Sequence, residues 1–258
     1  MEIKNAWVLI TGANRGIGRA VAEMCATNGA HLILGNRTKD GELVKSLQAL
    51  GAPSVIELQL DLSDPQHIES FLKELGDQRV DVLFNNSGQL VGGLFENQNL
   101  KEIYSMMQVN VLGLIHLTHR ILPGMLKRGK GKIINHSSVS AVMSLPTAST
   151  YAASKAAVRA FTDILRLELK GTGVTALVLL TPGVNTRMFN EIPEKSGPHI
   201  KGGVGDSLSP KIYADRIKEA ILEDLTVLAP SGMTGAMMKI AHHSPKIFER
   251  MVLTRFRR

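Results

Sequence analysis

The sequence predicts an α/β fold: a single domain on a doubly wound parallel sheet of about seven strands, with helices on both faces. Short runs of Val, Ile and Leu alternate along the chain with longer amphipathic stretches. The runs lack strict polar–apolar alternation, which is typical of strands that helices cover on both sides. A length of 258 residues suits one large α/β domain and is short for two.

The expected elements follow one another as strand and helix along most of the chain. Strands are expected at 7–10, 31–34, 55–60, 80–84, 132–136, 174–180 and 226–229, and helices at 17–28, 40–50, 65–75, 99–126, 150–171 and 210–223. Such alternation implies right-handed crossovers between parallel strands. The segment 182–210 is rich in Gly and Pro, and a connection that long is usually a lid or a binding loop. We see no linker, so residues 1–258 are expected to form one domain.

The composition and the charge limit the classes of protein to which this chain can belong. The formal net charge is +7, but residues 238–258 hold six basic residues against Glu249, so the rest of the chain is nearly neutral. A short basic tail does not favour nucleic-acid binding. The lone Cys25 cannot form an internal disulfide, which favours a reducing compartment. Without a secretory signal or a long apolar run, we expect a cytoplasmic protein.

A glycine-rich turn follows the first expected strand. Residues 11–18 read TGANRGIG, with Gly12, Gly16 and Gly18 directly before the first helix. A turn without side chains lets the backbone approach a pyrophosphate, and the helix N-terminus offers free N–H groups. The turn therefore predicts a dinucleotide-phosphate site that also includes Asn14, Arg15 and Ile17. The alternative is a merely tight connection between strand and helix.

The end of the second strand bears on the choice of dinucleotide. An acidic residue there would bind the adenosine ribose 2′-hydroxyl of NAD. This chain reads LILGNRTKD, in which Arg37 follows the strand and the nearest acid is Asp40. Arg37 and Arg15 suit bidentate contacts with a 2′-phosphate, so NADP(H) is favoured over NAD(H). Two solvated surface arginines are the alternative.

Further polar motifs fall at the ends of later strands. NNSG (85–88), NHSS (135–138) and PGVNT (182–186) follow three strands, and QVNVLG (108–113) lies in a helix. Tyr151 and Lys155 are four residues apart on one face of an expected helix. They are either an ordinary surface pair or a phenol whose pKa a neighbouring ammonium lowers. Ligands of open α/β sheets bind at these strand ends, which favours the second interpretation.

Taken together, these motifs resemble the short-chain dehydrogenase/reductase family over roughly residues 5–230. The resemblance implies a Rossmann-type domain that transfers a hydride between NAD(P)(H) and a carbonyl or alcohol carbon. It implies that Tyr151 is the general acid/base and that Lys155 binds the nicotinamide ribose and lowers the tyrosine pKa. It further implies that Ser138 orients the substrate oxygen and that Asn110 anchors a water in a proton relay.

The resemblance also implies cofactor contacts along the strand ends. Asp61 corresponds to the acid that contacts the adenine, and Thr186 to the threonine that holds the carboxamide. The other implied contacts are Asn86, Gly88, Pro182 and Gly183. One residue departs from the family pattern, because Ser87 stands where the strand-four motif usually has alanine.

Several neighbouring residues are not expected to act in catalysis. His136 is expected to pack or hydrogen-bond locally. Ser137 is expected on the opposite face of its strand from Ser138, because side chains alternate along a strand. His242 and His243 lack acidic or cysteine partners at ligand spacing, so no metal site is expected.

The expected function is an oxidoreductase that acts on a small carbonyl or alcohol substrate with NADP(H). A sensor or scaffold that keeps the fold without turnover is the alternative. The resemblance suggests that the two long helices pair with a second chain, in a homodimer or homotetramer. Segment 182–210 then becomes the substrate lid, where Met188 and Phe189 either close an apolar pocket or pack onto the fold.

The C-terminal segment 240–258 is expected to be a basic amphipathic extension. Phe248, Val252 and Phe256 fall four residues apart on a helix flanked by basic residues. Such a helix packs on its own domain or on a second subunit, or else touches an anionic membrane surface weakly. Membrane contact would place the protein at the inner face of a membrane and favour an apolar substrate.

Overall fold

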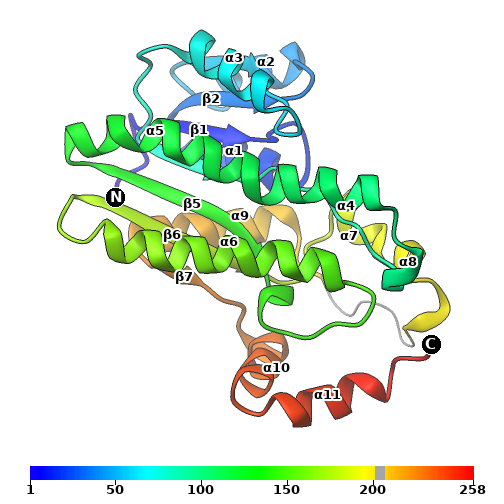
Figure 1. Ribbon diagram of the computed structural model, residues 1–258. Coiled ribbons are helices and arrows are strands. Elements are labelled where there is room, and N and C mark those ends of the chain that lie inside the picture. The colour runs from blue at the N-terminus through cyan, green and yellow to red at the C-terminus, as the bar shows by residue number, and fades with distance from the viewer. Residues whose placement is uncertain (201–206) are drawn as a thin grey trace.

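The computed structural model describes residues 1–200 and 207–258, and its centre is one parallel sheet (Figure 1). The strand order is β3-β2-β1-β4-β5-β6-β7. Their bounds are β1 Trp7–Thr11, β2 His31–Asn36, β3 Val55–Gln59, β4 Val82–Asn85, β5 Gly131–Ser138, β6 Val174–Thr181 and β7 Val227–Leu228. The chain adds strands outward from β1 in one direction and then from β4 in the other, so the expected doubly wound, Rossmann-type fold is confirmed.

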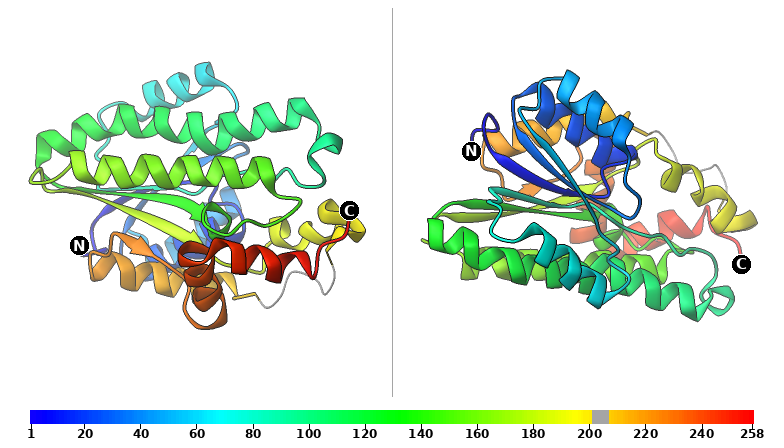
Figure 2. Two further views of the ribbon diagram at one scale, coloured as in Figure 1. Left: turned by 60° about the horizontal axis from the view of Figure 1, so that its bottom comes forward. Right: turned by 90° about the horizontal axis from the view of Figure 1, so that it is seen from above.

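Helices cover both faces of the sheet (Figure 2). One layer contains α1 Gly16–Thr27, α2 Gly41–Ala49 and α9 Pro210–Leu222, and the other contains α3 Pro65–Leu75, α5 Leu114–Arg128 and α6 Ser149–Glu168. Alternation along each strand supplies both cores. In β1, Ile10 packs with the first layer and Leu9 with the second, and both side chains are fully buried. This explains why the strands read as unbroken apolar runs.

The helix expected at 99–126 is interrupted. It consists of α4 Leu100–Met107, a π-helical segment at Gln108–Gly113 and then α5. A Cβ at Gly113 would lie 2.9 Å from Leu62 Cβ, so the helix crosses the β3–α3 connection at a distance that only glycine allows. A π turn inserts one extra residue into a helix and is frequent at functional sites. Apolar periodicity does not reveal that extra residue.

The segments after β6 form short helices. Part of the expected lid consists of α7 Arg187–Asn190, α8 Ile192–Ser196 and the single turn η4 Gly197–His199. The remainder of that lid includes residues 201–206, which lie outside the described residues. Two further single turns, η1 Phe95–Asn97 and η3 Val139–Ala141, follow β4 and β5.

The C-terminal segment forms two helices, α10 Gly232–His243 and α11 Pro245–Leu253, at the bottom of Figure 1. Phe248 is buried in a small apolar cluster with Met143 and Ala241, so this side of α11 faces its own domain. Phe256 pairs through its backbone with Ile200 in an antiparallel bridge. None of the helices in the described ranges is long and apolar enough to cross a membrane.

Candidate active site

The polar motifs meet at the carboxyl edge of the sheet. The glycine turn follows β1, NNSG begins in β4, Ser138 ends β5 and PGVNT follows β6. Because β1, β4, β5 and β6 are consecutive neighbours, segments more than 170 residues apart in sequence converge there. The crevice outside the carboxyl ends of such strands is where open α/β sheets bind their ligands.

The glycine turn has the geometry of a phosphate cradle. Gly12 and Gly16 adopt φ values of +71° and +58°, a region that L side chains rarely enter. At Gly18 a Cβ would lie 2.2 Å from the Gly12 carbonyl oxygen, so that position excludes any larger residue. Helix α1 begins at Gly16, and the side chain of Arg15 before it does not cap the first N–H groups of the helix. These free donors and the helix dipole suit a pyrophosphate, so the residues fit a dinucleotide.

Asn86 ties the end of β4 to this turn. Its Nδ2 donates to the carbonyl oxygens of Thr11 at 2.9 Å and of Gly12 at 3.1 Å. The Thr11 hydroxyl oxygen accepts from the backbone N–H groups of Asn86 and Ser87, both at 2.9 Å. Sequence reasoning assigned no role to Thr11, although it opens the TGANRGIG motif. Ser87 lies against the turn, since a Cβ at Gly12 would come within 2.8 Å of its Oγ.

The connection after β2 is held by hydrogen bonds of three polar side chains. Asn36 Oδ1 accepts from the backbone N–H of Ala13 at 2.7 Å, and Asn14 Nδ2 donates to the Thr38 carbonyl at 2.9 Å. The Asp40 carboxylate accepts from the backbone N–H of Leu43 and so caps α2. Asp40, the nearest acid after β2, is therefore occupied in a structural contact.

Arg15 and Arg37 are exposed at this end of the site. Within residues 1–200 and 207–258, neither has a carboxylate oxygen within the 4.0 Å of an ion pair. Burial would raise the pKa of Asp61, but hydrogen bonds from Ser63 and the charge of Arg37 outweigh it and lower that pKa. The longer-range field of Arg37 thus reaches Asp61, the residue expected at the adenine.

Ser138, Tyr151 and Lys155 come together beside the end of β5. Tyr151 lies in the first turn of α6, and the Ser138 side chain near it acts to lower the pKa of its phenol. The Lys155 Nζ lies 5.7 Å from the centre of the Tyr151 ring and donates to the His136 carbonyl oxygen at 2.8 Å. Ser137 points the other way, as alternation predicts, and its Oγ donates to the Lys155 carbonyl at 2.7 Å.

Burial dominates the electrostatics of this group. It raises the pKa of Tyr151 to about 12, and the interaction with Ser138 opposes that rise only partly. Burial also lowers the pKa of Lys155 to about 8. The stabilisation of the Tyr151 phenolate by Lys155, together with the oxidised nicotinamide, stays a prediction.

Asn110 lies in the π-helical segment and is buried. Its Oδ1 accepts from the Gln89 backbone N–H at 2.8 Å, and its Nδ2 donates to the Gln89 carbonyl at 3.0 Å and to Ser154 Oγ at 3.1 Å. Ser154 in turn donates to the Tyr151 carbonyl at 2.7 Å. The side chain thus joins the loop after β4 to the helix that carries Tyr151. Sequence reasoning missed Ser154, although it directly precedes Lys155 in that helix.

The segment after β6 lies over the glycine turn. A Cβ at Gly16 would lie 3.2 Å from Thr186 Cγ2, and Thr186 also caps α7. Pro182 and Gly183 precede it, and the Gly183 carbonyl accepts from the Leu208 N–H at 2.9 Å. Met188 and Phe189 are half-buried in α7.

Helix α8 contacts the loops that follow β4 and β5. Ser196 hydrogen-bonds Thr147 with an Oγ–Oγ1 distance of 3.0 Å. The Thr147 carbonyl accepts from the Gly93 N–H at 2.8 Å. The described part of the lid is thereby joined to the connections on the far side of the crevice.

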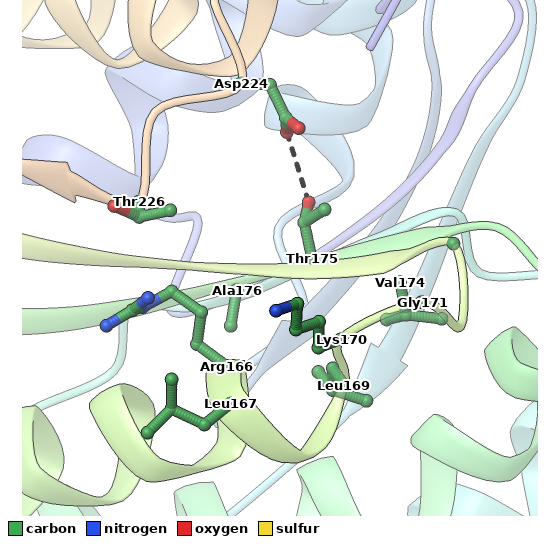
Figure 3. Close-up of a pocket in the computed structure, with 11 residues that line it drawn as sticks. Arg166, Leu167, Leu169, Lys170, Gly171, Val174, Thr175, Ala176, Asp224 and Thr226 are labelled. Atoms are coloured by element: carbon green, nitrogen blue, oxygen red, sulfur yellow. Dashed lines mark hydrogen bonds between the residues drawn. The ribbon is translucent and has the colours of Figure 1, made fainter.

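A hollow of about 510 Å³ lies apart from the candidate active site (Figure 3). It is lined by residues at the start of β6 and the end of α6, among them Arg166, Lys170, Thr175 and Asp224. The catalytic candidates lie at the opposite, carboxyl end of the sheet. This hollow is therefore separate from the candidate active site.

A glycine turn that suits a pyrophosphate lies at the carboxyl edge of this doubly wound sheet, together with a serine, a tyrosine and a lysine. This arrangement is typical of dinucleotide-dependent oxidoreductases. The family model described as short chain dehydrogenase matches residues 6–197. The chain belongs to this family, and hydride transfer with a nicotinamide dinucleotide is its class of reaction.

Relatives of known sequence or structure agree with this assignment. A ketoacyl reductase, HetN of a Nostoc species, is 30% identical over 254 residues, covering 95% of this chain and 87% of that protein. A Sphingobium yanoikuyae short-chain dehydrogenase in complex with NADPH has a TM-score of 0.81 at 25% identity, covering 98% of this chain and 97% of that one. A Burkholderia phymatum family member in complex with NAD has a TM-score of 0.82 at 26% identity, covering 96% of each chain.

We predict that Gly18→Ala weakens dinucleotide binding at least about tenfold, because the new methyl group would displace the Gly12 carbonyl or the Asn86 amide. Titration followed by nicotinamide fluorescence measures the Kd. Gly41→Ala is the matched control, since a Cβ there meets nothing within 4 Å. An unchanged Kd for Gly18→Ala would show that this turn does not hold the phosphates.

Proposed function

We propose that this protein is an NADP(H)-dependent oxidoreductase that interconverts a carbonyl and an alcohol, with Tyr151 as general acid/base. The observation that carries the proposal is that Ser138, Tyr151 and Lys155 come together at the same carboxyl edge of the sheet as the glycine turn. The family supplies the class of reaction. The ketoacyl reductase relative supports a ketone on an acyl chain as the first substrate to try.

The side chains of the site suit this chemistry. The bound dinucleotide supplies or accepts the hydride. As negative charge develops on the substrate oxygen, the Ser138 and Tyr151 hydroxyls are placed to donate hydrogen bonds to it, and Tyr151 gives up its proton. Burial holds the pKa of Tyr151 at about 12, so the phenol is protonated and ready to donate at neutral pH. Lys155, held by the His136 carbonyl, places a positive charge near the phenolate that forms.

The preference for NADP(H) rests on the end of the crevice near β2. Arg15 and Arg37 are exposed there, whereas Asp40 is occupied in capping α2. Two guanidinium groups, with the nearest acid after β2 engaged in a helix cap, suit a 2′-phosphate better than a 2′-hydroxyl. Family members bound to NADPH and to NAD both resemble this chain, so the preference is a property to be measured.

We further propose that the protein assembles with copies of itself and is located in the cytoplasm. The helices expected to pair expose large hydrophobic side chains on their outer faces, namely Tyr104, Leu112, Ile164 and Leu167. This exposure supports a homodimer or homotetramer. The buried lone thiol of Cys25, whose pKa burial raises to about 12, supports a reducing, cytoplasmic location. A sensor or scaffold without turnover is the weaker alternative, because Ser138, Tyr151 and Lys155 are all present.

A weak membrane contact through α11 is supported by its outward side. Ile247, Met251 and Leu253 are 56%, 41% and 60% exposed, beside the exposed cations Lys246 and Arg250. Apolar side chains interleaved with cations suit an anionic lipid surface, whereas two such surfaces would repel each other. If the protein binds at such a surface, an apolar substrate becomes the favoured hypothesis.

We predict that Tyr151→Phe lowers kcat at least about a hundredfold, because it removes the proton donor while leaving the ring in place. Oxidation of NADPH with a panel of 3-ketoacyl thioesters and simple ketones measures the rate. The Kd for NADPH is expected to stay within about twofold of the wild-type value. Turnover at the wild-type rate would rule out Tyr151 as the acid/base.

We predict that Arg37→Ala removes a preference for NADPH over NADH of at least about tenfold, or roughly 1.4 kcal/mol. Separate fluorescence titrations with the two dinucleotides measure it. Lys39→Ala, which removes another exposed cation two residues further on, is the control and should leave the ratio unchanged. Wild-type protein that binds NADH as tightly as NADPH would contradict the proposed preference.

We predict that the double variant Lys246→Ser/Arg250→Ser loses about tenfold or more of the wild-type partition onto vesicles with anionic lipid, since each surface cation contributes about 1 kcal/mol. Sedimentation with phosphatidylserine-containing vesicles measures it. The control is Lys127→Ser/Lys130→Ser, which removes two exposed cations at the opposite edge of the sheet. Equal losses in both variants would mean attraction by net charge alone.

A further inference from the structure

His136 lies in β5, two residues before Ser138 and on the same face of the strand. Its ring stacks near Phe84, with ring centres 6.3 Å apart and planes 16° apart. Its Nδ1 lies 3.2 Å from Asn86 Oδ1, and its backbone carbonyl accepts from Lys155 Nζ at 2.8 Å. One residue thus contacts both the strand-end amide and the catalytic ammonium.

The hydrogen bonds of Asn86 determine which imidazole nitrogen carries the proton. Asn86 Nδ2 faces two carbonyl oxygens, those of Thr11 and Gly12, so it must be the amide nitrogen and the oxygen must face His136. An amide oxygen only accepts hydrogen bonds. The Nδ1 of His136 therefore donates, and the ring is the Nδ1–H tautomer.

The ring remains neutral across the physiological range. Burial first, and then the charge of Lys155, lower the pKa of His136 to about 3. The donated hydrogen bond is consequently present at every pH at which the protein would work. Within the described residues, Asn86 Oδ1 has a hydrogen-bond contact with His136 alone.

We propose that His136 is a positioning residue for the dinucleotide, because its Nδ1–H orients the Asn86 amide that holds the glycine turn in place. An aliphatic residue of similar size would fill the same space but leave the Asn86 oxygen without its partner. The amide would then be free to rotate away from the Thr11 and Gly12 carbonyls. The contact between Lys155 and the carbonyl of residue 136 uses only the backbone, so side-chain variants retain it.

The test compares dinucleotide binding in His136→Leu and His136→Asn. The Leu variant is expected to bind NADPH about fivefold more weakly, the change expected for one lost neutral hydrogen bond. The Asn variant places an amide N–H close to the position of Nδ1 and is expected to restore the wild-type Kd. At saturating dinucleotide, kcat per folded molecule should stay unchanged in both variants, because Tyr151 and Lys155 keep their contacts.

Wild-type Kd values in both variants would overturn the proposal, as would equal weakening in both. His136→Gln is the second comparison if the Leu variant fails to fold, because its N–H lies one bond further out and should not restore binding. Thermal melting of each variant separates a loss of fold from a loss of affinity. The inference rests on dinucleotide binding at the glycine turn, which Gly18→Ala tests independently.

Discussion

Two hydrogen bonds from the Asn86 amide to the carbonyls of Thr11 and Gly12 hold the end of β4 against the glycine turn. The rest of the site depends on this contact. Strands β1 and β4 pair in parallel only as far as Ile10 and Phe84, so beyond that point side chains must join the two segments. Helix α1 starts within the joined turn, and its free N–H groups take their direction from it. The missing Cβ of Gly18 leaves the space that the amide occupies.

The catalytic candidates are arranged by burial as much as by mutual attraction. A buried ammonium is costly unless it is hydrogen-bonded, and Lys155 meets that requirement with the His136 carbonyl. Ser137 anchors the Lys155 backbone from the other side of the strand. Helix α6 is thus attached to β5 at Lys155, whose charge we propose that the reaction uses. The same desolvation raises the pKa of the Tyr151 phenol to about 12.

The π-helical segment sets the direction of the Asn110 side chain at the other side of the crevice. A regular helix through residues 99–126 would present its side chains at constant angular steps. The extra residue in the π turn changes the direction of the side chains locally. Asn110 there faces the backbone of Gln89 and the hydroxyl of Ser154, so it connects the loop after β4 with the helix of Tyr151.

The sequence by itself determined the fold class, the order of strands and helices, the glycine turn and the Tyr151–Lys155 face. These features are local: apolar periodicity, strand-end position and spacing within one helix encode them. Only the tertiary structure decided the π turn, the Asn86–Gly12 contact, the role of Thr11 and Ser154, and the donating nitrogen of His136. Each of these depends on groups that are distant in the chain and less than 4 Å apart in space, as in the contact between Asn86 and Thr11, which are 75 residues apart. Burial likewise raises the pKa of Tyr151, because desolvation is set by everything packed around a group and spacing along the chain does not reveal it.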